Sequence, residues 1–332
     1  MAAYTTIDNP ELYFQAKLYT GSGGTQSITL DGDEDMQPDL VWIKSRADTN
    51  PHTVVDAVRG ATKVIWTNVT SGEGTYTDEV TAFDSDGFSL GASSNAYANE
   101  NTITHVAWCW KESATAGFDI LTYTGNATNR TISHNLSAVP QVVIVKRTDA
   151  TTAWSSLHLN GVGSEYRMVL NDSAAPEDDA TMWQDTDPTS SVFTLGTSSS
   201  TNVNTGTYVA YCFAEKQGYS KFGNYTGNGN ADGAFVYTGF RPAFVLFKQT
   251  NTSGGHWYIY DNKRGQNELD KHLYPNVTSA EATGDNSIDI LSNGFKMRSN
   301  NGDSNASGGT YIYMAFAEAP FVNSNGVPCN AR

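Results

Sequence analysis

Residues 104–112, Thr-His-Val-Ala-Trp-Cys-Trp-Lys-Glu, form an apolar segment that returns twice in this chain of 332 residues. Residues 207–215 read Thr-Tyr-Val-Ala-Tyr-Cys-Phe-Ala-Glu, and residues 310–318 read Thr-Tyr-Ile-Tyr-Met-Ala-Phe-Ala-Glu. Another set repeats in the same order at a similar period, at residues 38–44, 140–146 and 242–248. A period of about 100 residues predicts three tandem domains, each with its own core, rather than a solenoid of short repeats.

The repeated segment has two apolar faces. Val106, Trp108 and Trp110 alternate with Ala107 and Cys109, so one face carries large side chains and the other carries small ones. Because successive side chains of a strand point to opposite faces, this pattern predicts a strand that is buried on both sides and central in its sheet. Such strands must pack on one another or on other copies of the chain, since exposed apolar strands aggregate.

The rest of each repeat is typical of a β-sandwich. Short runs rich in Val, Ile, Tyr, Phe and Thr alternate with Gly, Asn, Asp and Ser clusters. We therefore predict an all-β chain with three tandem antiparallel β-sandwiches, jelly-roll or lectin-like, and negligible helix. The one helical candidate is residues 9–14, where Asn9 precedes Pro10. The predicted divisions are an attachment segment (1–14), modules 1, 2 and 3 (15–114, 115–217 and 218–318) and a tail (319–332).

Composition excludes several classes of function. The chain carries 35 acidic and 20 basic residues, a net charge of −15, which argues against nucleic acid and anionic membranes as partners. The longest apolar run, residues 311–317, is far too short to insert into a membrane. The first ten residues do not have the basic start and apolar run of a secretory signal, so synthesis in the cytoplasm is expected.

No motif for catalysis or metal binding stands out. Residues 31–35 begin like a calcium loop, but Met36 and Trp42 occupy the places where glycine and glutamate are needed. The six histidines lack a zinc spacing, and no Gly-x-Ser-x-Gly elbow is present. Lys44, Lys146 and Lys248 each end a repeated strand and are interpreted as charges at a sheet rim. We predict a protein that is not an enzyme and that has no cofactor and no metal.

Aromatic and polar residues recur four positions apart in the middle of each module. Trp154 and His158 correspond to Trp257 and Asp261, so each pair is expected on one strand face, about 13 Å apart. An aromatic face beside polar groups can stack a sugar, which suggests a glycan contact. The alternative is that the tryptophans plug the edge of the sandwich. The candidate ligand-binding residues are Trp154, His158, Trp257, Asp261, Asp56, Arg59 and Arg264.

Several long strings resemble structural proteins of marine tailed phages. They include residues 3–8, 17–21, 38–44, 58–63, 106–111, 219–233 and 315–328, which together sample nearly the whole chain. The resemblance implies a virion protein that is made in the host cytoplasm, of the kind described as a tail fibre or structural protein. It assigns no catalytic residues.

From this resemblance we expect a tail fibre or surface appendage that attaches to a glycan of the host surface. Its expected partners are other virion proteins and further copies of itself, in a closed homo-oligomer such as a trimer. Two alternatives stay open, because sandwiches serve many functions: a capsid decoration or cement protein, and a carbohydrate-active enzyme of a tailspike.

Overall fold

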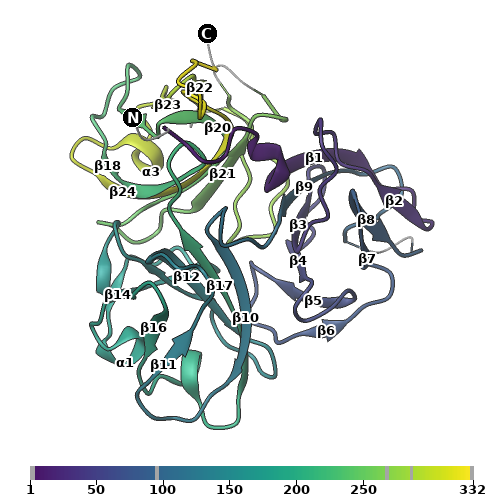
Figure 1. Cartoon of the computed structure of the whole chain (residues 1–332), viewed down its shortest axis with the longest axis vertical. Coiled ribbons are helices and arrows are strands. Elements are labelled where there is room, and N and C mark those ends of the chain that lie inside the picture. Colours follow the sequence, from purple (N-terminus) through teal and green to yellow (C-terminus); the bar gives the residue numbers. More distant parts are fainter. Residues whose placement is uncertain (1–3, 94–96, 266–268, 285–286, 330–332) are drawn as a thin grey trace.

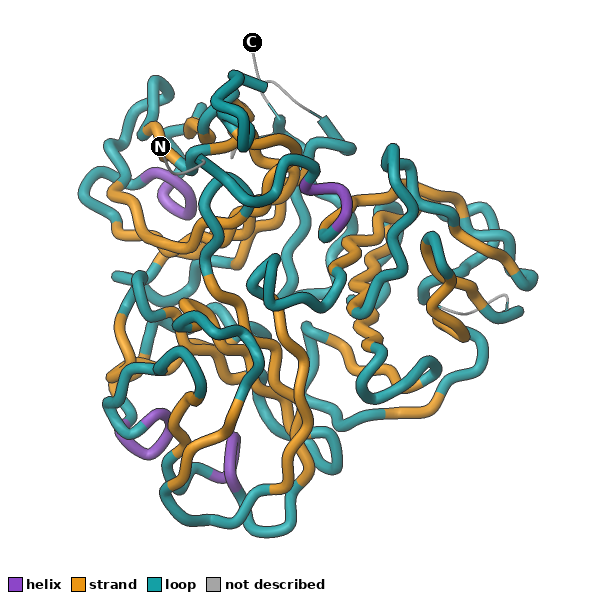
Figure 2. The backbone as a smooth tube through the Cα atoms, in the orientation of Figure 1, coloured by secondary structure: helices purple, strands orange, loops and turns teal. Residues whose placement is uncertain are grey.

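The computed structural model describes residues 4–93, 97–265, 269–284 and 287–329. Antiparallel strands are its main regular secondary structure, and helix is confined to short turns (Figure 2). This confirms the predicted all-β class with negligible helix. The described helices are η1 (Pro10–Leu12), α1 (Ala180–Trp183), α2 (Ser199–Asn202) and α3 (Gly302–Asn305).

Each module contains a large sheet and a small sheet. The large sheet of module 1 has the spatial order β1 (Phe14–Thr20), β9 (Thr104–Trp110), β3 (Leu40–Ser45), β4 (Thr53–Asp56), β5 (Lys63–Trp66), β6 (Gly74–Thr75). That of module 2 has the order β10 (Phe118–Thr124), β17 (Thr207–Ala214), β12 (Pro140–Arg147), β13 (Ser155–His158), β14 (Gly163–Val169), β15 (Glu177–Asp178). That of module 3 has the order β18 (Ser220–Thr226), β24 (Thr310–Pro320), β20 (Phe240–Gln249), β21 (Trp257–Asp261). The small sheet of module 1 has the order β2 (Gln26–Ile28), β8 (Gly87–Leu90), β7 (Val80–Asp84). That of module 2 pairs β11 (Arg130–Ser133) with β16 (Val192–Leu195), and that of module 3 has the order β19 (Phe235–Tyr237), β23 (Gly294–Met297), β22 (Ile288–Leu291).

The repeated segment forms the second strand of each large sheet. β9 lies between β1 and β3, and Trp108 stands opposite both Ala16 and Trp42. β17 and β24 hold the same place in modules 2 and 3. The alternation of apolar residues on both faces therefore predicts the central position correctly, because only an inner strand has neighbours on both edges and cover on both faces.

The two faces of this strand enter different cores. Ala107 and Cys109 pack with Phe88 of the small sheet in a core that belongs to module 1 alone. The large face, with Trp108, enters one core that all three modules share, where Tyr211 and Met314 are its counterparts. The modules surround this shared core as three lobes (Figure 1).

Aromatic rings from different modules meet in the shared core. The ring centroids of Trp110 in module 1 and Phe244 in module 3 are 5.5 Å apart. Those of Phe213 in module 2 and Phe316 in module 3 are 5.8 Å apart, and both pairs pack edge to face. Such contacts add to the free energy gained by burying the rings. The apolar faces are thus covered by neighbouring modules of the same chain.

The unrepeated ends of the chain also pack on module 3. Asn9 caps η1 by accepting a hydrogen bond from the Glu11 amide, as the sequence predicts for this turn. Further back, Tyr4 Oη donates to the carbonyl of Gly239 at 2.8 Å. Asp8 accepts from the Ser324 amide at 2.6 Å, which joins the N-terminal segment to the tail. The described parts of the two end segments, residues 4–14 and 319–329, lie beside module 3 (Figure 1), so they are docked against the body.

Candidate functional site

The residues that the sequence singles out lie where the modules meet. We call these contacts junction 1/2, junction 2/3 and junction 3/1, after the modules on either side. The side chains of all seven candidates are buried, so they offer no surface to an external glycan. Junction 1/2 holds Asp56, Arg59 and Trp154; junction 2/3 holds His158 and Trp257; junction 3/1 holds Asp261 and Arg264.

The two candidate tryptophans bind a neighbouring module. Trp154 Nε1 donates to the carbonyl of Trp66 at 2.9 Å, and Trp257 Nε1 donates to that of Val169 at 3.0 Å. Trp66 and Val169 end equivalent strands, β5 and β14, so the two bonds correspond. Because a buried indole N–H needs an acceptor, each bond fixes one module against the next. Module 1 has His52 at this place, and its Nδ1 accepts from Trp42 at 3.0 Å.

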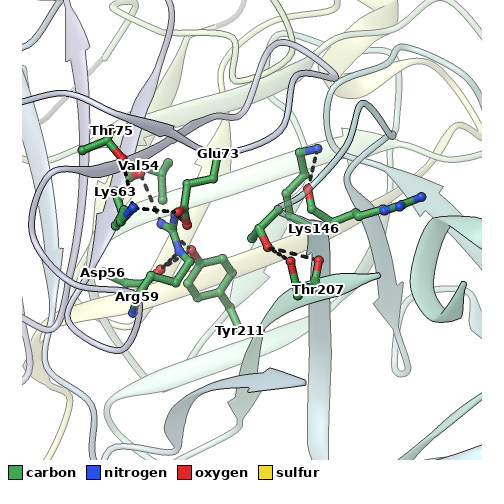
Figure 3. Close-up of polar contacts among 11 residues, drawn as sticks. Val54, Asp56, Arg59, Lys63, Glu73, Thr75, Lys146, Thr207 and Tyr211 are labelled. Atoms are coloured by element: carbon green, nitrogen blue, oxygen red, sulfur yellow. Dashed lines mark hydrogen bonds and ion pairs between the residues drawn. The ribbon is translucent and has the colours of Figure 1, made fainter. Parts of the chain in front are cut away.

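An ion cluster crosses junction 1/2 (Figure 3). Asp56 Oδ2 accepts from Arg59 Nε at 2.6 Å and from Tyr211 Oη of module 2 at 2.7 Å. The guanidinium also lies 3.2 Å from Glu73. Burial disfavours the charge of Arg59, but Tyr211, Asp56 and Glu73 outweigh burial and raise its pKa. The Asp56 carboxylate therefore accepts from a charged donor of module 1, Arg59, and from a neutral donor of module 2, Tyr211. Arg59 stays charged.

A matching cluster crosses junction 3/1. Asp261 Oδ2 accepts from Arg264 Nε at 2.6 Å and from Trp108 Nε1 of module 1 at 2.9 Å. Glu281 lies 3.3 Å from Arg264 and 2.8 Å from Arg46 of module 1. Burial raises the pKa of Glu281, but the two arginines outweigh burial and lower it. Asp261 and Asp56 thus perform the same task at two junctions.

Junction 2/3 lacks this ion cluster. Module 2 places His158 and Gly161 where module 1 has Asp56 and Arg59. The His158 ring lies 5.6 Å from Trp257, and its Nε2 is buried without a hydrogen-bond partner. Burial lowers the pKa of His158 to about 3, so the ring is neutral at ordinary pH. Among the described residues, this junction is held by apolar packing and by hydrogen bonds from side chains such as Trp257 and Lys248 to backbone carbonyls.

Acid should therefore weaken the fold through His158. The pKa of a histidine is about 6.5 in an unfolded chain and about 3 at this site, so falling pH protonates the unfolded state first. The contribution of neutral His158 to the free energy of unfolding is complete above pH 6.5 and is lost as pH falls towards 3. At pH 4.5 the free energy of unfolding should be lower by about 2–3 kcal/mol for this reason. We expect His158→Phe to resemble the wild type at pH 7.5 and to be more stable at pH 4.5. Urea unfolding at both pH values measures the difference, and equal losses in both proteins would contradict the assignment.

The three lysines interpreted as rim charges are buried instead. Lys44, Lys146 and Lys248 have no exposed surface. Lys146 Nζ donates to the carbonyl of Thr70 in module 1 at 3.0 Å, and Lys248 Nζ donates to that of Ser173 in module 2 at 3.1 Å. Burial lowers the pKa of each lysine to about 8. These ammonium groups stay charged at pH 7, where two of them bind backbone carbonyls across a junction.

The described residues show neither a metal-binding group nor a large cavity in the shared core. They contain no group of three or more His, Cys, Asp or Glu side chains placed to hold a metal ion. The shared core encloses a cavity of about 40 Å³, lined mostly by large apolar side chains such as Trp42 and Phe244, too small for a substrate. In the described parts of the chain, none of the helices has the length and apolarity of a membrane span.

A family model described as "Domain of unknown function (DUF7483)" matches residues 9–320 of this chain. The matched span contains all three modules and all three junctions of this chain. A search for similar curated proteins found no match.

Proposed function

The chain belongs to the family described as a domain of unknown function, DUF7483, and we propose that it is a non-enzymatic structural protein of a bacteriophage virion. Within the virion we assign it to a tail fibre or surface appendage that binds a glycan of the host surface. The resemblance of strings such as residues 38–44 and 219–233 to structural proteins of marine tailed phages supports this proposal.

The observation that carries the proposal is how the junctions use their charged groups. Asp56 and Arg59 pair with each other, as do Asp261 and Arg264, and Lys146 is held by backbone carbonyls. A catalytic acid or base must reach a substrate, whereas these groups hold modules together. A body of this kind, with one core shared by three modules, suits a protein that resists force and presents surfaces.

We further propose other virion proteins and host glycans as partners, and the assembled particle as the location. A homo-oligomer remains part of the proposal, although the apolar strand faces that motivated it are covered within one chain. The net charge of −15 does not favour nucleic acid.

Phage particles that carry this chain provide the test. Protein mass spectrometry of purified particles should detect the chain, and cryo-electron microscopy should place it on the tail or an appendage. Density over the capsid lattice would instead establish the decoration alternative. Absence from purified particles would overturn the proposal, and release of soluble sugars from host glycan by the isolated chain would establish the enzyme alternative.

A further inference from the structure

A surface groove lies at junction 1/2 and another lies at the equivalent place in junction 2/3. Both are lined by equivalent strand ends: residues 122–124 with Thr148 and Thr207 in the first groove, and residues 224–226 with Thr250 and Thr310 in the second. The threonines form the same pair, with Oγ1 atoms 2.7 Å apart in the first groove and 2.8 Å apart in the second. The grooves can therefore be compared position by position.

The first groove is narrowed by charged side chains. Arg59 and Glu73 line it, and Lys63 lies beside Glu73 (Figure 3). The remaining cavity is about 230 Å³. At junction 3/1, Arg46 takes the position that Thr148 has here, and its guanidinium binds Glu281 at 2.8 Å. Junctions 1/2 and 3/1 thus both have an ion pair at the position of the groove.

The second groove has none of these charges. Gly161, Tyr166 and Pro176 occupy the places of Arg59, Lys63 and Glu73, and the cavity is about 420 Å³. A Cβ on Gly161 would lie 2.3 Å from Ile312 Cγ2 of module 3, so an arginine could enter here only if Ile312 moved. No lining residue of this groove is charged. A volume of this size falls in the range of ligand pockets.

Pro176 changes the backbone as well. The Glu73 amide donates to the Thr148 carbonyl at 2.7 Å, and the Glu281 amide donates to the Arg46 carbonyl at 2.9 Å. Proline has no N–H, so Thr250 does not receive the equivalent bond. The substitution leaves a carbonyl acceptor at the edge of the groove.

Two asparagines are held in fixed orientation at this groove. Asn224 Nδ2 donates to the Asn160 carbonyl at 2.9 Å, and Asn251 Oδ1 accepts from the Thr310 amide at 3.1 Å. Each bond uses one end of a side-chain amide, which leaves Asn224 Oδ1 as an acceptor and Asn251 Nδ2 as a donor for a ligand. Polar groups that are already oriented bind with less loss of entropy.

Tyr166 supplies the aromatic surface. It is 37% exposed, unlike the buried tryptophans of the junctions, and it stands on β14 at the rim. Asp178 stands opposite Tyr166 on β15, but it does not line the groove, whose lining residues are uncharged. A ring beside amides and hydroxyls matches a ligand that has one apolar face and many hydroxyl groups. Neutral sugars have this chemistry.

We propose that the groove at junction 2/3 binds a neutral mono- or disaccharide unit, which stacks on Tyr166 and hydrogen-bonds to Asn224, Asn251 and the threonine pair. This proposal rests on the proposed function, since it names the surface that meets the host glycan. It replaces the buried candidates as the place of contact.

Matched variants of the full chain test the site. Thr250→Arg fills the groove with the residue type that stands at the equivalent place in junction 3/1, and Thr148→Arg makes the same change in the neighbouring groove. Tyr166→Ala removes the exposed ring without opening a core. Thermal unfolding shows which variants are folded. Binding is measured on an array of neutral glycans ending in glucose, galactose, mannose or N-acetylglucosamine, and then by titration of the best binder.

We expect Thr250→Arg and Tyr166→Ala to weaken binding about tenfold or more, which corresponds to a loss of about 1.4 kcal/mol, and Thr148→Arg to bind like the wild type. Equal binding by all variants would overturn this site but leave glycan attachment through another surface. Binding by the wild type to acidic glycans alone, or to none, would overturn the neutral-sugar assignment. The presence of the chain on particles is measured separately and does not depend on either result.

Discussion

Replacing Trp257 by alanine should lower the free energy of unfolding by about 3–5 kcal/mol. The side chain is 1% exposed and belongs to the shared core, so its removal leaves a cavity between modules 2 and 3. The variant also leaves the Val169 carbonyl without its indole donor. Urea unfolding followed by circular dichroism measures the loss.

Two Trp→Phe variants separate packing from hydrogen bonding. Trp257→Phe keeps a ring but loses the N–H, and should cost about 1–3 kcal/mol. Trp66→Phe is the matched control, because Trp66 Nε1 is buried without a partner and its loss should be neutral within about 1 kcal/mol. If Trp257→Ala is as stable as the wild type, the indole does not hold the junction.

Asp261→Ala should destabilise the chain by about 3–5 kcal/mol, since it removes the nearer of the two carboxylates that pair with a buried guanidinium. Arg264 has no exposed side-chain surface, and Asp261 also accepts from Trp108 across junction 3/1. The double variant Asp261→Leu with Arg264→Met removes both charges and should recover at least about 1–2 kcal/mol of the loss.

An exposed ion pair provides the control for this prediction. Asp31, paired with Lys17, is half exposed, so Asp31→Ala should cost less than about 1 kcal/mol. Urea unfolding of all these variants at pH 7 gives the comparison. A loss from Asp261→Ala as small as that from Asp31→Ala would show that the buried pair contributes nothing beyond a surface contact.

The face pattern of residues 104–112 predicts a great deal of this fold. It identifies a central strand with two buried faces, and its repetition leads to the three modules. The pattern does not tell which surface covers the large face, because an apolar face is satisfied equally by the same chain or by another. Trp108 and Tyr211 therefore look alike in sequence whether they meet a neighbouring module or a second copy.

The candidate site was only partly accessible to sequence reasoning. The spacing of the repeats places Trp257 at the position of Trp154 and Asp261 at the position of His158. In the structure, Trp257 and Asp261 each lie at a junction. The spacing in the sequence does not reveal that Trp257 and Asp261 are buried, because their burial depends on residues about 90 to 150 positions away, such as Val169 and Trp108. The groove with Tyr166 was missed, although the loss of Arg59 and Glu73 equivalents in module 2 is visible once the repeats are aligned.

The single-turn helices were missed for a different reason. Four residues are too few to show a helical period. Their signal lies in the preceding cap: Asp179, Ser198 and Asn301 each accept a hydrogen bond from an amide two residues further on. Capping residues also stand in many turns, so this signal alone does not separate a helical turn from a loop.

The shared core also sets the order of events during synthesis. Its first aromatic contributor is Phe14 and its last is Phe316, which comes 302 residues later in the chain. A nascent chain that has completed modules 1 and 2 still exposes the apolar side chains that module 3 covers, such as Trp110 and Phe213. Such surfaces aggregate or recruit chaperones. Closure waits for β24, which contributes Phe316, so truncations within the last module should leave insoluble chains and not shorter working ones.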